Sequence, residues 1–105
     1  MVYKVKADFL KALSHPLRLK IIEILKHREK SVGALVNQLG TQQSSLSRHL
    51  LALRDAGILK SRQERTTVFY SIQDHDVFHV LRPIAVMLRK KFKESERVIS
   101  TLGKE

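Results

Sequence analysis

The apolar residues of this chain follow a helical period, change to an extended pattern and then return to a helical one. Apolar side chains recur every three or four residues from Val5 to Leu53, which is typical of amphipathic helices. Two β-rich runs follow at 58–62 and 67–72, with four polar residues between them. Helical spacing returns after Asp74. In a chain of 105 residues, this order predicts one domain of a mostly α (α+β) class, with five helices and a two-stranded β-hairpin between helices 4 and 5.

Proline, glycine and capping residues mark where the first four helices begin and end. Pro16 suits the first turn of a second helix, because its missing N–H is not needed there, and this helix is expected to end near His27-Arg28. Ser31 is expected to cap the third helix and Gly40 to end it. Thr41 is expected to cap the fourth helix, and Gly57 follows its end. Two short helices joined around Gly40 and followed by a hairpin predict a winged helix-turn-helix.

The fourth helix has a polar face suited to DNA. With Leu46, Leu50 and Leu53 turned inward, a rotation of about 100° per residue leaves Gln, Ser and Arg outside, and no acidic residue lies between Thr41 and Arg54. Short polar side chains near the positive end of a helix suit entry into a major groove. Arg48 can make a bidentate contact to guanine, and Gln43 to adenine. The residues expected to read bases are Gln43, Ser44, Ser47 and Arg48.

The charge of the chain favours a polyanionic partner. Twenty Lys and Arg residues against ten Asp and Glu residues give a net charge of +10, which favours nucleic acid or an anionic membrane surface. The hairpin contributes to this charge through Lys60 and two arginines. Phosphate or minor-groove contacts are expected from Thr41, Ser45, Arg62 and Arg65. The alternative interpretation of the two arginines is a solvated hairpin tip.

The hairpin tip lacks glycine. Its residues are Gln63-Glu64-Arg65-Thr66, whereas tight primed turns need a positive φ, which only glycine accepts freely. The sequence therefore predicts a longer or a strained loop at this point.

Four motifs occur in an order that resembles the ArsR/SmtB family of bacterial winged-helix repressors, and the resemblance covers roughly residues 7–81. The motifs are Ser14-His15-Pro16-Leu17-Arg18-Leu19, Ser44-Ser45-Leu46-Ser47-Arg48-His49-Leu50, Leu53-Arg54-Asp55-Ala56-Gly57-Ile58-Leu59 and Phe69-Tyr70-Ser71-Ile72. The resemblance implies a repressor whose first and last helices form a symmetric homodimer. It also implies that the two fourth helices enter successive major grooves of an inverted-repeat operator. An inducer, often a metal ion, would release the DNA.

The resemblance and the periodicity together give a domain layout. A single winged-helix DNA-binding domain is expected over 1–105, with the helix-turn-helix at 31–57 and the wing at 58–72. The segments 1–13 and 74–102 are expected to be dimerisation helices. Their apolar faces are expected to supply the dimer contacts Val5, Phe9, Leu81, Ile84, Leu88 and Phe92.

The family's usual metal ligands are missing. The chain has no cysteine, which removes the Cys pair of the first family site and excludes disulfides and thiol chemistry. In the second family site, two ligand positions hold Met87 and Lys90, which are poor zinc ligands. One alternative is that His75 and His79, one helical turn apart on the same helix face, supply two ligands to a metal ion. A second subunit would have to supply a further ligand. We therefore predict no cofactor. The sequence does not indicate whether an inducer exists or what it is.

Other classes of protein fit the sequence less well. An enzyme would need a Gly-rich phosphate loop, a Cys nucleophile or paired carboxylates, and the sequence offers none of these. The basic last helix could bind anionic lipid, but its heptad-like apolar spacing indicates helix–helix packing. A winged helix that binds DNA without sequence preference, or that binds a protein, is the remaining alternative. Because no apolar run could span a bilayer and no secretory signal is visible, we expect a cytoplasmic protein.

Overall fold

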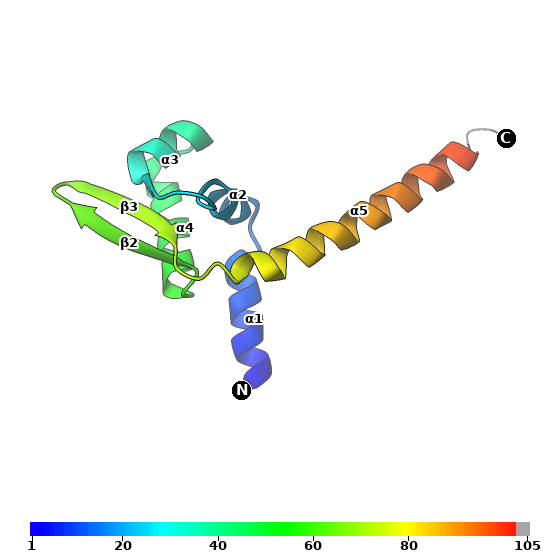
Figure 1. Ribbon diagram of the computed structural model, residues 1–105, viewed down its shortest axis with the longest axis horizontal. Helices are drawn as coiled ribbons and strands as arrows, with labels where there is room; N and C mark the ends of the chain where they lie inside the picture. The colour runs from blue at the N-terminus through cyan, green and yellow to red at the C-terminus, as the bar shows by residue number, and fades with distance from the viewer. Residues whose placement is uncertain (103–105) are drawn as a thin grey trace. The chain divides into compact units, whose positions relative to one another are not determined.

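The computed structural model describes the backbone of residues 1–102 and the side chains of residues 1–97 (Figure 1). It contains α1 (Val2–Leu13), α2 (Pro16–Ile24), β1 (Lys30–Ser31), α3 (Val32–Leu39), α4 (Gln43–Asp55), β2 (Leu59–Glu64), β3 (Thr67–Ile72) and α5 (Val77–Leu102). The predicted winged helix-turn-helix, with five helices and a hairpin between the fourth and the fifth, is thus confirmed. The chain forms two compact units, Met1–Asp74 and the segment from His75 onwards.

Three helix boundaries, the start of α2 and both ends of α3, follow the capping chemistry. The side chain of His15 accepts a hydrogen bond from the Leu17 N–H at the start of α2, just before Pro16. The hydroxyl of Ser31 accepts one from the Ala34 N–H at 3.1 Å and so caps α3. Gly40 ends α3 with a left-handed φ of 63°.

Two of the boundaries predicted for the first unit are wrong. Helix α4 begins one residue later than expected: its N-cap is Gln42, and no side chain caps the free N–H groups there, so Thr41 is not the cap. Helix α2 ends at Ile24, before the expected 27–28. Helix α4 is therefore held in place by its packing and not by a cap.

The core of the first unit is apolar throughout. Leu46, Leu50 and Leu53 of α4 have no exposed surface, as their spacing predicted. They share this core with the fully buried Ile21 and Leu35. Burial of a side chain of this size contributes about 1.5–3 kcal/mol. Among the side chains that the structure describes, no charged or strongly polar one is buried.

The sheet has a third strand that the sequence did not predict. Its order is β1-β3-β2, and all pairs are antiparallel. Strand β1 contributes only two pairs, Lys30 with Tyr70 and Ser31 with Phe69. A two-residue strand is too short to show a period of two, and for this reason the pattern did not reveal it. Because Ser31 also caps α3, this short strand joins the hairpin to the start of the helix-turn-helix.

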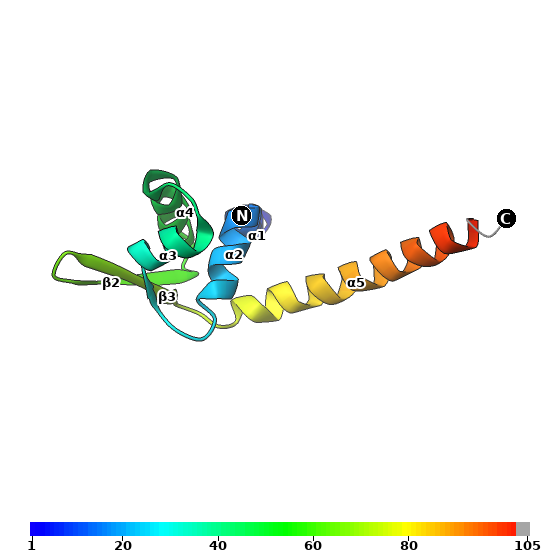
Figure 2. The same ribbon diagram turned by 90° about the horizontal axis from the view of Figure 1, so that it is seen from above.

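The hairpin forms a tight turn. Glu64 pairs with Thr67, so only Arg65 and Thr66 lie in the turn, and the expectation of a longer loop is wrong. The expected strain is present, because Arg65 has a φ of 57°. Such a conformation costs a residue other than glycine about 1–2 kcal/mol. The Gln63 Nε2 donates a hydrogen bond to the Arg65 carbonyl at 3.1 Å and helps to hold the turn. The hairpin projects from the helices of its unit (Figure 2).

Helix α5 is continuous and begins at Val77, not at Asp74. Pro83 lies inside it without dividing it. The helix is amphipathic, and its large apolar side chains include the exposed Ile84, Leu88 and Phe92. Of the helices in the described part of the chain, none is both long and apolar enough to cross a membrane.

Candidate nucleic-acid interface

Helix α4 presents a polar surface opposite its buried leucines. Gln43, Ser44 and Arg48 are exposed, while Ser45 and Ser47 are half-buried. Because the leucine stripe is completely covered, the rotation of α4 about its axis is determined and its polar face must point outward. All four residues predicted to read bases therefore lie on an accessible part of one helix.

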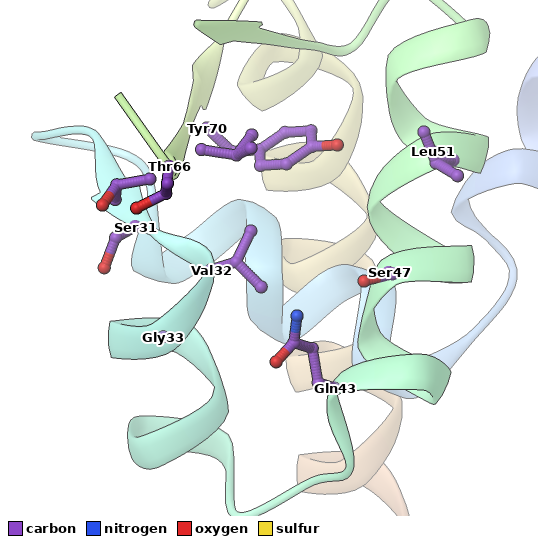
Figure 3. Close-up of a pocket in the computed structure, with 10 residues that line it drawn as sticks. Ser31, Val32, Gly33, Gln43, Ser47, Leu51, Thr66 and Tyr70 are labelled. Atoms are coloured by element: carbon purple, nitrogen blue, oxygen red, sulfur yellow. The ribbon is translucent and has the colours of Figure 1, made fainter. Parts of the chain in front are cut away.

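A pocket lies between α3, α4 and the hairpin, with a volume of about 480 Å³. Figure 3 shows Gln43, Ser47 and Leu51 one above another along α4, at intervals of one helical turn. The opposite side of the pocket includes Val32 at the start of α3 and Tyr70 on β3. No charged side chain lines this pocket, so Gln43 and Ser47 meet a neutral, partly apolar surface.

Leu51 is a large apolar residue on the outward face of α4, where the sequence offers no reason for it. Its side chain is 41% exposed and lines the same pocket as Ser47. Thr66, one of the two turn residues of the wing, lines this pocket as well. The fold thus brings the polar face of α4 and the tip of the hairpin to the two sides of one hollow, which periodicity alone could not predict.

The two wing arginines have different surroundings. Arg65 is exposed at the turn. Arg62 lies on β2 and donates from Nε to Glu29 Oε2 at 2.9 Å and from Nη2 to Glu29 Oε1 at 2.5 Å. Its Nη1 donates to Glu64 Oε2 at 3.0 Å. The hydrogen bond from Arg62 lowers the pKa of Glu29, and those from Arg62 to Glu29 and Glu64 raise the pKa of the arginine.

A second polar cluster lies against the middle of α4, at His49. Arg18 on α2 donates from Nε to His49 Nδ1 at 3.0 Å and from Nη1 to the Ala12 carbonyl of α1 at 3.1 Å. The rings of His15 and His49 lie 4.3 Å apart. Both histidines therefore take part in the contact between the start of α2 and α4. Burial lowers the pKa of His49, and electrostatic interactions with His15, Arg18 and Arg48 lower it further.

The comparison with known proteins agrees with this geometry. Residues 15–61 match the sequence pattern of bacterial regulatory proteins of the arsR family. Over 102 residues, the chain is 35% identical to the HTH-type transcriptional regulator Rv0081 of Mycobacterium tuberculosis, an alignment that covers 96% of this chain and 90% of that protein. The chain belongs to the ArsR family of bacterial regulatory proteins.

Solved structures place the fold of this ArsR-family chain among winged-helix regulators. The crystal structure of Rv0081 superposes with a TM-score of 0.80 at 36% identity, and covers 90% of this chain and 95% of that one. A homodimeric winged helix-turn-helix DNA-binding domain, Mb0332 of Mycobacterium bovis, has a TM-score of 0.75 at 28% identity over 85% of this chain and 82% of that one. The biofilm growth-associated repressor of Xylella fastidiosa is 41% identical over 68 residues, 65% of this chain and 60% of that protein.

The residues predicted for the dimer lie on two helices of this ArsR-family chain. On α1, Val5 is exposed and Phe9 is half-buried. On α5, Leu81 precedes the exposed Ile84, Leu88 and Phe92. A hollow of about 610 Å³ lies along α5; it is lined by the apolar Pro83, Val86 and Met87 and by the basic His79, Arg82 and Lys90.

The local metal alternative is not supported by further donors. Within the described residues, no group of three or more His, Cys, Asp or Glu side chains is arranged to hold a metal ion. His79 Nδ1 lies 3.4 Å from Asp76 Oδ1, and the ring of His75 lies 6.1 Å from that of Phe78. In this ArsR-family chain the pair His75 and His79 would therefore need ligands from outside the described chain.

Proposed function

We propose that the protein is a homodimeric repressor that binds an inverted-repeat operator in double-stranded DNA through α4. The observation that carries this proposal is the accessible polar face of α4, which has no acidic side chain from Gln43 to Arg54 and is fixed in orientation by three leucines without exposed surface. Membership of a family of bacterial regulatory proteins supports it, and so does the net charge of +10. Such a role belongs in the cytoplasm, where bacterial DNA lies.

The contacts divide into two kinds. Side chains on the polar face of α4 read base edges in the major groove, because Arg and Gln can each make bidentate contacts there. These are Gln43, Ser44, Ser47 and Arg48. Contacts to phosphate or to the minor groove come from Thr41, Ser45 and the exposed Arg65 of the wing. Arg62 was predicted to join this second group, but its carboxylate partners compete with such a role and are considered below.

The dimer is proposed to form through the apolar faces of α1 and α5. Exposed large apolar residues on both helices would leave water when two copies pack together. The homodimeric state of Mb0332, a relative in fold and sequence, supports this arrangement. The contacts proposed are Val5, Phe9, Leu81, Ile84, Leu88 and Phe92.

Selection of binding sites from a random duplex pool tests this function. The purified protein would be used at near-physiological salt, so that purely electrostatic binding is weak. Enrichment of an inverted repeat, with half-sites about one helical turn apart, is the expected result. Tight binding at low salt without any enriched sequence would instead indicate a protein that coats DNA without sequence preference.

The direction of regulation needs a separate experiment. A reporter gene placed behind the selected operator should be expressed more strongly when the protein is absent. Lower expression in its absence would show that the protein activates transcription. In either case the DNA-binding proposal would stand, since the two experiments have different readouts.

A further inference from the structure

Arg62 and Glu29 form a clamp across the sheet of the wing. Glu29 immediately precedes β1 and lies 33 residues before Arg62 in the chain. Its two carboxylate oxygens accept from two nitrogens of the guanidinium, Nε and Nη2. This is the bidentate fork geometry that makes an arginine–carboxylate pair directional as well as attractive. The pair therefore ties one edge of the sheet to the other.

The middle strand supports this clamp. Arg62 pairs across the strands with Phe69, which also pairs with Ser31 of β1. The Arg62 Cζ lies 4.3 Å from the centre of the Phe69 ring, so the guanidinium lies over the aromatic side chain between the two edges. Glu64, two residues further along β2, accepts a third hydrogen bond. Three groups from three places in the chain thus hold the guanidinium in one orientation.

The clamp lies where the backbone pairing is weakest. Strand β1 contributes only two residue pairs to the sheet, whereas β2 and β3 share six. Since the hydroxyl of Ser31 caps α3, this short pairing is also one of the links between the wing and the helix-turn-helix, beside the packing of β2 on α4 and of β3 on α3. Exposed ion pairs usually contribute little, but bidentate geometry within a network is the exception. A clamp at this point would limit movement of the wing relative to α3.

The charges of the cluster disfavour a direct phosphate contact. Glu29 and Glu64 together carry two negative charges against the single positive charge of Arg62. Lys60 also acts electrostatically on Glu29. The guanidinium is nevertheless already bonded to two carboxylates, and Arg62 would have to release one of them to bind a phosphate. Arg65 at the turn, in contrast, has no hydrogen-bonded side-chain carboxylate among the described contacts.

We propose that Arg62 is a positioning residue which, with Glu29, fixes the wing relative to the helix-turn-helix and so determines where Arg65 meets DNA. The part of this proposal that concerns DNA rests on the proposed function. The clamp itself concerns the sheet alone and can be tested without DNA.

The first test measures amide hydrogen exchange of β1 and β3 in the free protein. Arg62→Lys keeps the charge but lacks the planar fork, and Glu29→Gln keeps the size of the side chain but removes its charge. Each should raise the exchange rate of the β1–β3 amides about two- to fivefold, the range of a well-formed exposed pair. The double variant should add little to either single one, because both remove the same interaction. Arg65→Lys, the same change at the turn, is the matched control and should leave these rates unchanged.

The second test measures DNA affinity over a series of salt concentrations. If Arg62 positions the wing, Arg62→Lys and Glu29→Gln should both weaken binding, and neither should lower the slope of log K against log salt by more than Arg65→Ala does, because both act through the Arg65 contact. If Arg62 contacts phosphate, Glu29→Gln should tighten binding by freeing the arginine, and Arg62→Lys should have little effect.

The outcomes separate the two proposals. Unchanged exchange in both single variants, or full additivity in the double variant, would overturn the clamp even if the protein binds its operator well. Faster exchange in a protein that selects no DNA sequence would support the clamp and reject the proposed function. Tighter DNA binding by Glu29→Gln would overturn the positioning role of Arg62.

Discussion

Helices α4 and α5 both have a stripe of apolar side chains, and the two stripes have different surroundings. In α4, Leu46, Leu50 and Leu53 have no exposed surface, because other parts of the same chain cover them. In α5, Leu88 is 43% exposed and Phe92 is 66% exposed. The packing of α4 is thus complete within one chain, which leaves its polar face for a ligand. The apolar face of α5 is available for a second copy of the chain, as the proposed dimer requires.

Substitutions in the apolar stripes of α4 and α5 should have the largest effects, and they test whether one stripe belongs to the core and the other to a dimer interface. Leu50→Ala should lower the free energy of unfolding by about 2–5 kcal/mol, because it leaves a cavity in a closely packed core. Leu88→Asp should instead shift the protein from dimer to monomer and keep its helix content, because an aspartate at an apolar interface would be desolvated without a partner. Urea denaturation, circular dichroism and sedimentation velocity measure these quantities. If Leu88→Asp remained dimeric, the role given to α5 would be wrong.

A second prediction concerns the polar face of α4. Arg48→Ala should weaken binding to the selected operator by about 1–3 kcal/mol and relax the preference at one base position. Arg89→Ala, which removes an exposed arginine from α5, is the matched control and should keep the base preference unchanged. Competition binding with single-base operator variants measures both effects. Equal losses in the two variants would mean that α4 contributes charge but reads no base.

A third prediction distinguishes the wing from α4. Arg65→Ala should weaken binding similarly for all sequences and should reduce the salt slope by about one unit, as expected for the loss of one phosphate contact. Arg65→Gly removes the same charge and also relieves the positive φ, so it should be more stable than Arg65→Ala by about 1–2 kcal/mol. A salt slope at the wild-type value in both variants would argue against the phosphate contact.

The smallest expected effect is a dependence of stability on pH that comes from His49, in the middle of α4. His49 accepts a hydrogen bond from Arg18 and has a pKa below its ordinary value of 6.5. The unfolded chain therefore binds a proton more readily than the native protein, and stability should fall as the pH drops below 6.5 towards the native pKa. The loss should level off once the pH is below the native pKa of His49.

His49→Asn is the control for this pH dependence, because its side-chain oxygen can accept from Arg18 but does not titrate. Urea denaturation between pH 8 and pH 5 should show a smaller loss of stability in the variant than in the wild type. The difference between the two curves isolates His49 from the other four histidines of the chain. Parallel curves would show that protonation of His49 does not oppose folding.

Several parts of the fold followed from local sequence alone. The order of helices and strands was predicted from changes in apolar period, and Ser31 and Gly40 marked the ends of α3 correctly. The buried stripe of α4 and its accessible opposite face were predicted from the spacing of three leucines. These features depend on residues a few positions apart, and their geometry is set by the helix itself.

Other parts could be seen only in three dimensions. The sequence did not indicate strand β1, because two residues show no period, nor the tight turn, because Arg65 is a residue that rarely adopts a positive φ. Glu29 was missed as a partner of the wing because it lies 33 residues from Arg62. Likewise, no spacing rule pairs Arg18 with His49, which are 31 residues apart.

By itself, the sequence of this ArsR-family chain determined which segments are helical, which face of α4 is apolar, and that the whole molecule attracts a polyanion. The tertiary structure decided which charged groups are available for that partner. Arg62 and Arg65 are the same type of residue and lie three positions apart. Arg62 is surrounded by carboxylates and an aromatic ring, whereas Arg65 lies at an exposed turn. The physical reason is that periodicity predicts contacts between residues a few positions apart in one helix or strand. The partners of a surface arginine can come from distant segments of the chain, which only folding brings together.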